Sequence, residues 1–268
     1  MRALRFYKVS PGGNPTILIL DPVPSHERVA VAQRLLAADH LQAEQVGYLD
    51  LTADPVRLDM MGGEFCGNAC RAAALVMLQE GIGLEKNGDM WHGMLSASGT
   101  SRPLRVQVDL RGTHPTCWAE MPLPAPQALT LCAPGIGLVH MPGISHLCLN
   151  EALHSFPTDY VEAACELRKS FDLTACDAAG CIWYQYKEES RYKIKPVVWV
   201  RGTDSTYLET GCGSGSLAVA LWLEKEKNVP ATCQIIQPSG ETIGVQRERH
   251  CAWIFGPTRL IARGQAYL

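Results

Sequence analysis

The chain has 268 residues, of which 47% are apolar, and a formal net charge of -3. This length and composition can supply the core of one large domain or of two domains of about 130 residues each. Acidic and basic residues are interspersed, so the sequence lacks the basic stripe that nucleic-acid binding requires. No apolar run approaches the roughly 18 residues that cross a bilayer, and the first residues lack a signal-peptide pattern. We therefore expect a cytoplasmic protein with neither nucleic-acid nor membrane partners.

The eleven cysteines do not form a recognisable framework. Their number is odd, the chain is too long to need disulfides for stability, and no CxxC pair or regular zinc spacing occurs. Most of them are expected to be small buried hydrophobes. A metal site is not predicted, and a cysteine proposed as catalytic needs further support from its surroundings.

Apolar runs alternate with helical patterns along the chain, which predicts an α/β (α+β) protein. Between the first two predicted strands, residues 25–40 have helical spacing and begin with Ser25 as a candidate cap. A proline-rich passage at 121–127 is the best candidate for a linker. A second helix is predicted near 160–171, followed by further strands. The predicted strands are 16–20, 46–51, 104–110, 116–121, 143–149, 180–186 and 195–200.

Two segments in opposite halves of the chain resemble each other. EFCGNACRAAALVML at 64–78 aligns without gaps with TGCGSGSLAVALWLE at 210–224, and this places Cys66 over Cys212. Each cysteine is followed by a glycine and then by an Ala/Leu-rich helical pattern. Such a pair of similar blocks is typical of an internal duplication.

The position of these cysteines favours acid/base chemistry. Unpaired N–H groups at a helix N-terminus can lower the pKa of a thiol, and they can also bind an anion such as a carboxylate. Two facing thiols could remove a proton from one face of a Cα atom and supply one to the other face. A papain-like site with His146 as the base remains an alternative. A phosphate loop is disfavoured because GCGSGS lacks the required GK[ST] ending.

Taken together, these blocks resemble the diaminopimelate epimerase family over essentially the whole chain. The resemblance implies catalytic roles for Cys66 and Cys212 and a thiol-tuning role for His146. It implies no pyridoxal phosphate, metal or other cofactor, and it leaves a homodimer open. Substrate-binding roles fall on Asn14, Gln45, Gly67, Asn68, Gly213 and Ser214.

The fold that the resemblance implies is a pair of pseudo-symmetric domains. Each is a sheet wrapped around a central helix, and the active site lies in the cleft between them. The expected domains are residues 1–121, joined by a returning strand at about 259–268, and residues 122–258.

Departures from the epimerase pattern bear on the substrate. Family members that act on diaminopimelate hold its distal end with asparagines and a Glu-Arg pair. The matching positions here are Ile144-Ser145, Ala179-Gly180 and Thr203-Asp204. A site built for a distal charged group loses affinity when the partners of that group are missing. Diaminopimelate is therefore a poor substrate candidate.

The blocks SPGGNPTIL, EQVGYL, GGEFCGNA and QPSG are instead similar to those of family members that racemise histidine for opine-type metallophores. This implies an amino-acid substrate, histidine. Glu44 is a candidate for binding its imidazole, and Glu64 and Glu209 are candidates for tuning the thiols. The sequence leaves open a diaminopimelate epimerase, a racemase of another amino acid, an isomerase or dehydratase relative, and a binding protein without turnover.

Overall fold

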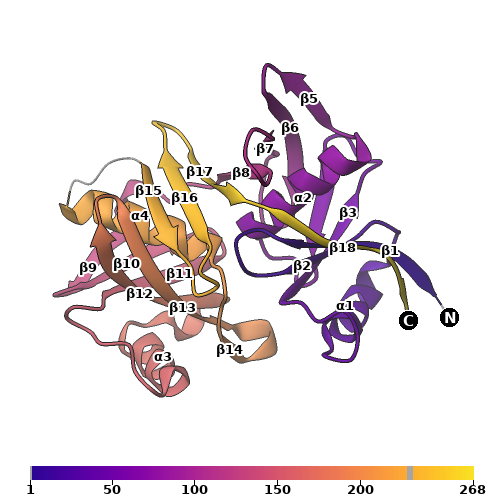
Figure 1. Ribbon diagram of the computed structural model, residues 1–268. Coiled ribbons are helices and arrows are strands. Elements are labelled where there is room, and N and C mark those ends of the chain that lie inside the picture. Colours follow the sequence, from indigo (N-terminus) through magenta and orange to yellow (C-terminus); the bar gives the residue numbers. More distant parts are fainter. Residues whose placement is uncertain (1, 228–231) are drawn as a thin grey trace. The chain divides into compact units, whose positions relative to one another are not determined.

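A computed structural model describes residues 2–227 and 232–268 of the chain. In these residues, strands predominate and four α-helices lie between them, so the fold is of the mixed α/β type (Figure 1). The chain divides into two compact units. Unit 1 comprises Met1–Glu120 and Phe255–Leu268, and unit 2 comprises Met121–Ile254.

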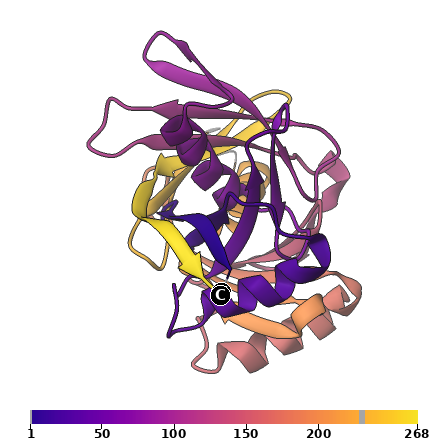
Figure 2. The ribbon, with the colours of Figure 1, turned by 90° about the vertical axis from the view of Figure 1, so that its right-hand side faces the viewer.

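Unit 1 is built around a strongly twisted array of strands. Strand β1 (Ala3–Ser10) lies between β2 (Thr16–Ile19) and β18 (Arg259–Tyr267), and it is antiparallel to both. Both ribbon views show β18 beside β1 (Figures 1 and 2). The other elements of the unit are α1 (Arg28–Leu36), β3 (Gln45–Asp50), β4 (Val56–Met60), α2 (Gly67–Glu80), β5 (Leu84–Asn87), β6 (Met90–Ala97), β7 (Leu104–Asp109) and β8 (Thr116–Met121).

Helix α2 forms the centre of unit 1. All of its residues from Gly67 to Met77 are buried, and it packs against β1, β2, β6 and β7. Its sequence is rich in alanine, leucine and methionine, which have high helix propensity and pack closely. The helix ends at Gly81, whose φ of 68° is the left-handed conformation that glycine adopts at little cost. A helix that is apolar on all sides is stable only when strands surround it.

A charged side chain of α2 is buried with it. The Arg71 guanidinium is 0% exposed and donates hydrogen bonds to the main-chain oxygens of Pro11 (2.9 Å), Cys117 (3.1 Å) and Pro257 (3.3 Å). Burial lowers the pKa of Arg71 to about 10. This one side chain therefore ties α2 to three distant segments of unit 1.

The predicted helix at 25–40 is shorter than expected. Residues Ser25–Glu27 form a 3-10 turn, and the α-helix runs only over Arg28–Leu36. Ser25 does not cap it, because the N-cap position falls on Glu27. At the other end Ala37 has an extended ψ of 145°, and the Leu41 N–H closes the turn on the Leu35 oxygen. The helical pattern in the sequence thus extends to residue 40, although the helix itself ends at Leu36, where the chain leaves the core.

Unit 2 repeats the strand pairing of unit 1. Strand β11 (Ile144–Asn150) is parallel to β12 (Ala178–Glu188), as β2 is to β3, and β12 is antiparallel to β13 (Arg191–Val200), as β3 is to β4. Strand β13 is parallel to β15 (Thr232–Ile236), as β4 is to β6. The remaining elements are β9 (Leu129–Ala133), β10 (Ile136–Met141), α3 (Tyr160–Ser170), β14 (Ser205–Leu208), α4 (Gly213–Lys227), β16 (Thr242–Arg247) and β17 (Ala252–Pro257).

Helix α4 takes in unit 2 the place that α2 takes in unit 1. It packs against β10, β11, β12 and β16. Cys66 and Cys212 are each the residue immediately before the buried helix of their unit. The two similar sequence blocks therefore correspond to the same structural feature.

Candidate active site

Cys66 caps the N-terminus of α2 with its sulfur atom. Its backbone is extended, with φ -134° and ψ 108°, and its Sγ accepts a hydrogen bond from the Ala69 N–H at 3.4 Å. A sulfur atom here fills the acceptor role that a Ser, Thr or Asp oxygen usually fills. The thiol is partly exposed. It can therefore meet a ligand while remaining fixed to the helix.

A chain of hydrogen bonds joins Cys66 to two other predicted site residues. The Cys66 thiol donates to Gln45 Oε1 at 3.2 Å, and Gln45 Nε2 donates to Thr16 Oγ1 at 2.7 Å. Thr16 Oγ1 in turn donates to the main-chain oxygen of Asn14 at 3.1 Å. Asn14 is buried and has a positive φ of 52°. The starts of β2 and β3 thus bring Asn14, Gln45 and Cys66 together, through a threonine that the sequence analysis missed.

Cys212 has the same relation to α4. Its Sγ accepts a hydrogen bond from the Gly215 N–H at 3.3 Å and lies 3.6 Å from Ser214 Oγ. Gly215 leaves room for this contact, because a Cβ atom at its position would lie 2.9 Å from Ile182 Cδ1 and 3.0 Å from the Cys212 sulfur. Cys212 is only 3% exposed, so its thiol is more deeply buried than that of Cys66.

The expected lowering of the thiol pKa is wrong for Cys212. Burial raises the pKa of its thiol well above the usual value, and the hydrogen-bonded carboxylate of Glu209 raises it further. The Ser214 hydroxyl and the Gly215 N–H act in the predicted direction and lower the pKa, but their effect is smaller. A thiolate loses its hydration when it is buried, and here that cost outweighs the favourable groups of the helix N-terminus.

His146 stands behind Ser214 in the core of unit 2. Its Nε2 lies 3.0 Å from Ser214 Oγ, and the side chain is 0% exposed. Burial lowers the pKa of His146 to about 3, so the imidazole is neutral at physiological pH. Gly180, its neighbour on β12, leaves the necessary space, because a Cβ atom there would lie 2.2 Å from His146 Nδ1.

The two units differ at this place. In unit 1 the corresponding strand pair sets Leu18 opposite Gly47, and a Cβ atom on Gly47 would lie 3.0 Å from a methyl group of Leu18. The glycine space is therefore filled by an apolar side chain in unit 1 and by an imidazole in unit 2. Among the described residues, only Cys212 is linked to a histidine in this way, through Ser214.

Except for Glu44, the remaining predicted residues lie within three residues of the two thiols along the chain. Gly67 and Asn68 begin α2, and Gly213 and Ser214 begin α4. Glu64 lies two residues before Cys66 and is exposed, as is Glu44 beside Gln45. Glu209 contacts Cys212, as described above.

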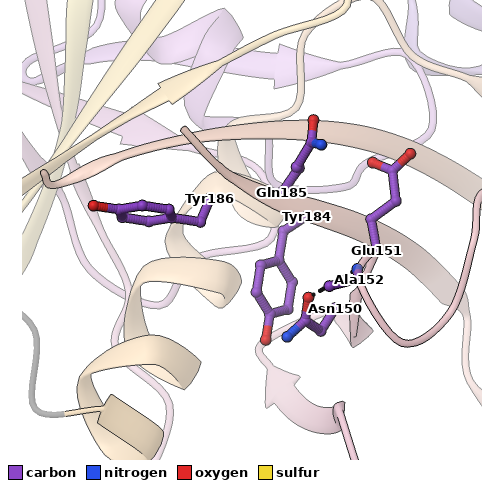
Figure 3. A pocket seen from close by; sticks show the side chains of 6 residues that line it. All are labelled: Asn150, Glu151, Ala152, Tyr184, Gln185 and Tyr186. Atoms are coloured by element: carbon purple, nitrogen blue, oxygen red, sulfur yellow. Dashed lines mark hydrogen bonds between the residues drawn. The ribbon is translucent and has the colours of Figure 1, made fainter. Parts of the chain in front are cut away.

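Two surface cavities lie away from these residues. One, of about 410 Å³, is lined in unit 2 by Asn150, Glu151, Ala152, Tyr184, Gln185 and Tyr186 (Figure 3). Within it, Asn150 Oδ1 accepts a hydrogen bond from the Ala152 N–H at 3.1 Å. The other, of about 760 Å³, is formed in unit 1 by segments around residues 51–56, 82–85, 92–94 and 105–107. Neither cavity is lined by a predicted site residue.

Two further properties bear on the site. Among the described residues, no group of three or more His, Cys, Asp and Glu side chains could hold a metal ion. In the same part of the chain, no helix has the length and apolar character needed to cross a membrane.

Solved structures share this fold. A hydroxyproline epimerase from Agrobacterium vitis, crystallised with trans-4-hydroxy-L-proline, has a TM-score of 0.69 at 13% identity, covering 100% of this chain and 93% of that one. A phenazine biosynthesis PhzF family protein from Enterococcus faecalis has a TM-score of 0.67 at 15% identity, with full coverage of both chains. The chain thus has the fold that these proteins share.

Sequence comparison identifies the family to which the chain belongs. The family model for the histidine racemase CntK N-terminal domain matches residues 3–267. A histidine racemase from Fusobacterium nucleatum is 28% identical over 275 residues, covering 100% of this chain and 98% of the relative. A histidine racemase from Staphylococcus aureus is 23% identical over 286 residues, with the same coverage. The chain belongs to the histidine racemase family.

Proposed function

We propose that the protein interconverts L- and D-histidine with Cys66 and Cys212 as two bases: one removes the Cα proton, and the other delivers its own proton to the opposite face. The observation that carries this proposal is the matched placement of the two thiols. Each sulfur caps a buried helix and accepts an N–H three residues further on, at 3.4 Å for Cys66 and 3.3 Å for Cys212. Racemisation needs one acid/base group on each face of Cα, and two equivalent thiols supply this pair.

In the proposed reaction one cysteine acts as a thiolate and the other as a thiol. The thiolate takes the Cα proton of one enantiomer, the charge spreads into the substrate carboxylate, and the opposite thiol donates a proton to the other face. The first turns of α2 and α4 supply N–H groups and the positive ends of two helix dipoles for the carboxylate. Gly67, Asn68, Gly213 and Ser214 are our candidates for this role.

The side chains next to each sulfur would stabilise its thiolate or its thiol form by hydrogen bonds. His146 is neutral, and its Nδ1 has no hydrogen-bond partner among the described residues. A buried N–H without an acceptor is costly, so the ring proton is better placed on Nε2, where it is donated to Ser214. The Ser214 hydroxyl is then able to donate to Cys212 when that residue is a thiolate. When Cys66 is a thiol, its S–H donates a hydrogen bond to Gln45 Oε1.

Histidine as substrate is supported by membership of the histidine racemase family and by full-length similarity to histidine racemases from two organisms. We propose Glu44 as a partner for the imidazole, because it is exposed next to Gln45. We also propose that the reaction proceeds without a cofactor in the cytoplasm and supplies D-histidine for an opine-type metallophore. A racemase of another amino acid is the second candidate, since the loss of the diaminopimelate clamp does not by itself select histidine.

The test is incubation with each L-amino acid in D2O, followed by chiral separation and mass analysis. Histidine should racemise fastest and gain one deuterium. Cys66→Ala and Cys212→Ala should each abolish racemisation, whereas Cys165→Ala, which changes a partly exposed cysteine on α3, should not. Each inactive variant keeps one thiol, so we expect slow Cα exchange of a single enantiomer. Cys212→Ala, which keeps Cys66, should exchange the L form, and Cys66→Ala, which keeps Cys212, should exchange the D form.

Two results would overturn the proposal. Racemisation near the wild-type rate by either cysteine variant would remove the two-thiol mechanism. Much faster turnover of diaminopimelate or proline than of histidine would remove the substrate assignment.

A further inference from the structure

A buried glutamine in unit 2 binds the main chain of Cys212. Gln237 follows β15 directly and is 0% exposed. Its Oε1 accepts the Cys212 N–H at 2.9 Å, and its Nε2 donates to Ser216 Oγ at 3.0 Å and to the Ile235 oxygen at 2.9 Å. Both ends of this side-chain amide are therefore occupied.

The hydrogen bonds close a ring around the Cys212 peptide units. Ser216 Oγ donates to the Cys212 oxygen at 2.6 Å, and the same oxygen accepts the Ser216 N–H at 3.0 Å. Since the serine proton is used in this way, Ser216 Oγ must accept from Gln237 Nε2. The Cys212 N–H can only donate and so faces Oε1. These constraints fix the orientation of the glutamine amide without ambiguity.

This ring of hydrogen bonds supplies an acceptor that the backbone of α4 cannot supply. The N–H of an N-cap residue lies outside the helical hydrogen bonds, and a buried N–H needs an acceptor. Gln237 provides that acceptor and holds both the N–H and the oxygen of Cys212. Because the Cα–Cβ bond leaves the same backbone atoms, the direction of the thiol is held as well.

Unit 1 contains a related arrangement at the equivalent place. Ser98 directly follows β6, the strand that is parallel to β4, just as Gln237 follows β15, the strand that is parallel to β13. Ser98 Oγ accepts the Met60 N–H at 3.0 Å and donates to the Glu64 oxygen at 2.6 Å. It therefore holds the chain two residues before Cys66, whereas Gln237 holds Cys212 directly.

We propose that Gln237 is a positioning residue that aims the Cys212 thiol at the substrate Cα. This inference rests on the proposed function, because it assigns a role in proton transfer. It predicts that loss of Gln237 impairs the step carried out by Cys212 and spares the step carried out by Cys66.

The experiment compares Gln237→Met, which keeps the length and loses all three hydrogen bonds, with Gln237→Glu, which keeps an acceptor for Cys212. Each change is combined with Cys66→Ala and, separately, with Cys212→Ala, and Cα exchange in D2O is measured. A misplacement of about 1 Å can reduce a rate about 100-fold. We expect Gln237→Met to slow exchange by Cys212 roughly 10- to 100-fold, with exchange by Cys66 changed less than about threefold. Gln237→Glu should lie between wild type and Gln237→Met.

A second measurement does not depend on activity. Amide hydrogen exchange of the Cys212 N–H, followed by NMR, should become at least about tenfold faster in Gln237→Met, while the amides of Leu217 and Ala218 within α4 keep their protection. Ser98→Ala serves as the matched change, and it should leave the Cys212 amide protected.

The outcomes separate the two proposals. If neither Cys66→Ala nor Cys212→Ala exchanges Cα protons, the two-thiol mechanism fails. The amide measurement still tests whether Gln237 holds Cys212. Equal slowing of the two exchange reactions would show a general loss of structure and overturn the positioning role. Unchanged exchange at both the substrate Cα and the Cys212 amide would overturn it as well.

Discussion

The contact between Gly180 and His146 can be tested by adding a single methyl group. In Gly180→Ala the new Cβ would meet His146 Nδ1 at 2.2 Å and Cε1 at 2.8 Å, with Ile182 Cδ1 at 3.3 Å. His146 is fully buried, so it cannot move aside into solvent. The imidazole must tilt, and this movement draws Nε2 away from Ser214.

Two consequences are expected in Gly180→Ala. Overpacking of a buried site costs about 1–3 kcal/mol, which for a chain of this size lowers Tm by roughly 2–5 °C. Loss of the His146–Ser214 hydrogen bond removes about 1–1.5 kcal/mol of support for the Cys212 thiolate, which corresponds to roughly a tenfold lower kcat. Differential scanning calorimetry and racemisation of L-histidine measure the two effects separately.

Two other glycines provide the controls. Gly47→Ala makes the equivalent change in unit 1, where the new Cβ would meet methyl groups of Leu58 at 2.8 Å and Leu18 at 3.0 Å. It should lower Tm without the selective loss of exchange by Cys212. Gly202→Ala meets no atom within 4 Å and should alter neither quantity. Wild-type kcat and Tm in Gly180→Ala would refute the reasoning, because they would mean that His146 is not held at this glycine.

Three other changes test the fold and the cofactor expectation. Arg71→Met leaves three main-chain oxygens without their donor and should destabilise the protein by about 3 kcal/mol, measured by urea unfolding, whereas the exposed Arg34→Met should cost less than about 0.5 kcal/mol. Burial alone would raise the pKa of Glu120, but hydrogen bonds from Arg102 and Arg105 outweigh it and hold the pKa at about 2, so its contribution of roughly 2 kcal/mol is present above about pH 5 and is lost as the pH falls toward 2. Glu120→Gln should flatten the acid limb of stability against pH, and an unchanged limb would contradict this assignment. Activity should survive dialysis against EDTA, and the protein should show no pyridoxal absorbance; loss of activity that added metal restores would count against a cofactor-free reaction.

The sequence predicted the two helices that follow Cys66 and Cys212 better than the residues that support these cysteines. Each CG block is contiguous, and the Ala/Leu pattern after it identifies a buried helix, so the positions of Cys66 and Cys212 at two N-termini could be inferred. The strands at 16–20, 46–51, 104–110 and 116–121 were also correctly predicted to within two residues. These features depend on local composition, which a single sequence displays directly.

Features that depend on tertiary contacts could not be inferred in the same way. Thr16 and Gln237 support the two cysteines from segments that are distant in the sequence; both lie in blocks that resemble the family, but the blocks do not show which side chains reach the cysteines. The pKa of Cys212 was predicted in the wrong direction, because its local N–H groups are visible in the sequence and its complete burial is not. The end of α1 at Leu36 likewise depends on where the chain leaves the core.

The pairing of β1 with β18 affects how the protein is made. Strand β1 is synthesised early, but one of its two neighbours, residues 259–267, is separated from it by the whole of unit 2. The Pro257 oxygen that Arg71 binds emerges equally late. On the ribosome, unit 1 therefore exposes a strand edge and a cationic core residue throughout the synthesis of unit 2. Unit 1 is then the part of the nascent chain that most needs protection by chaperones.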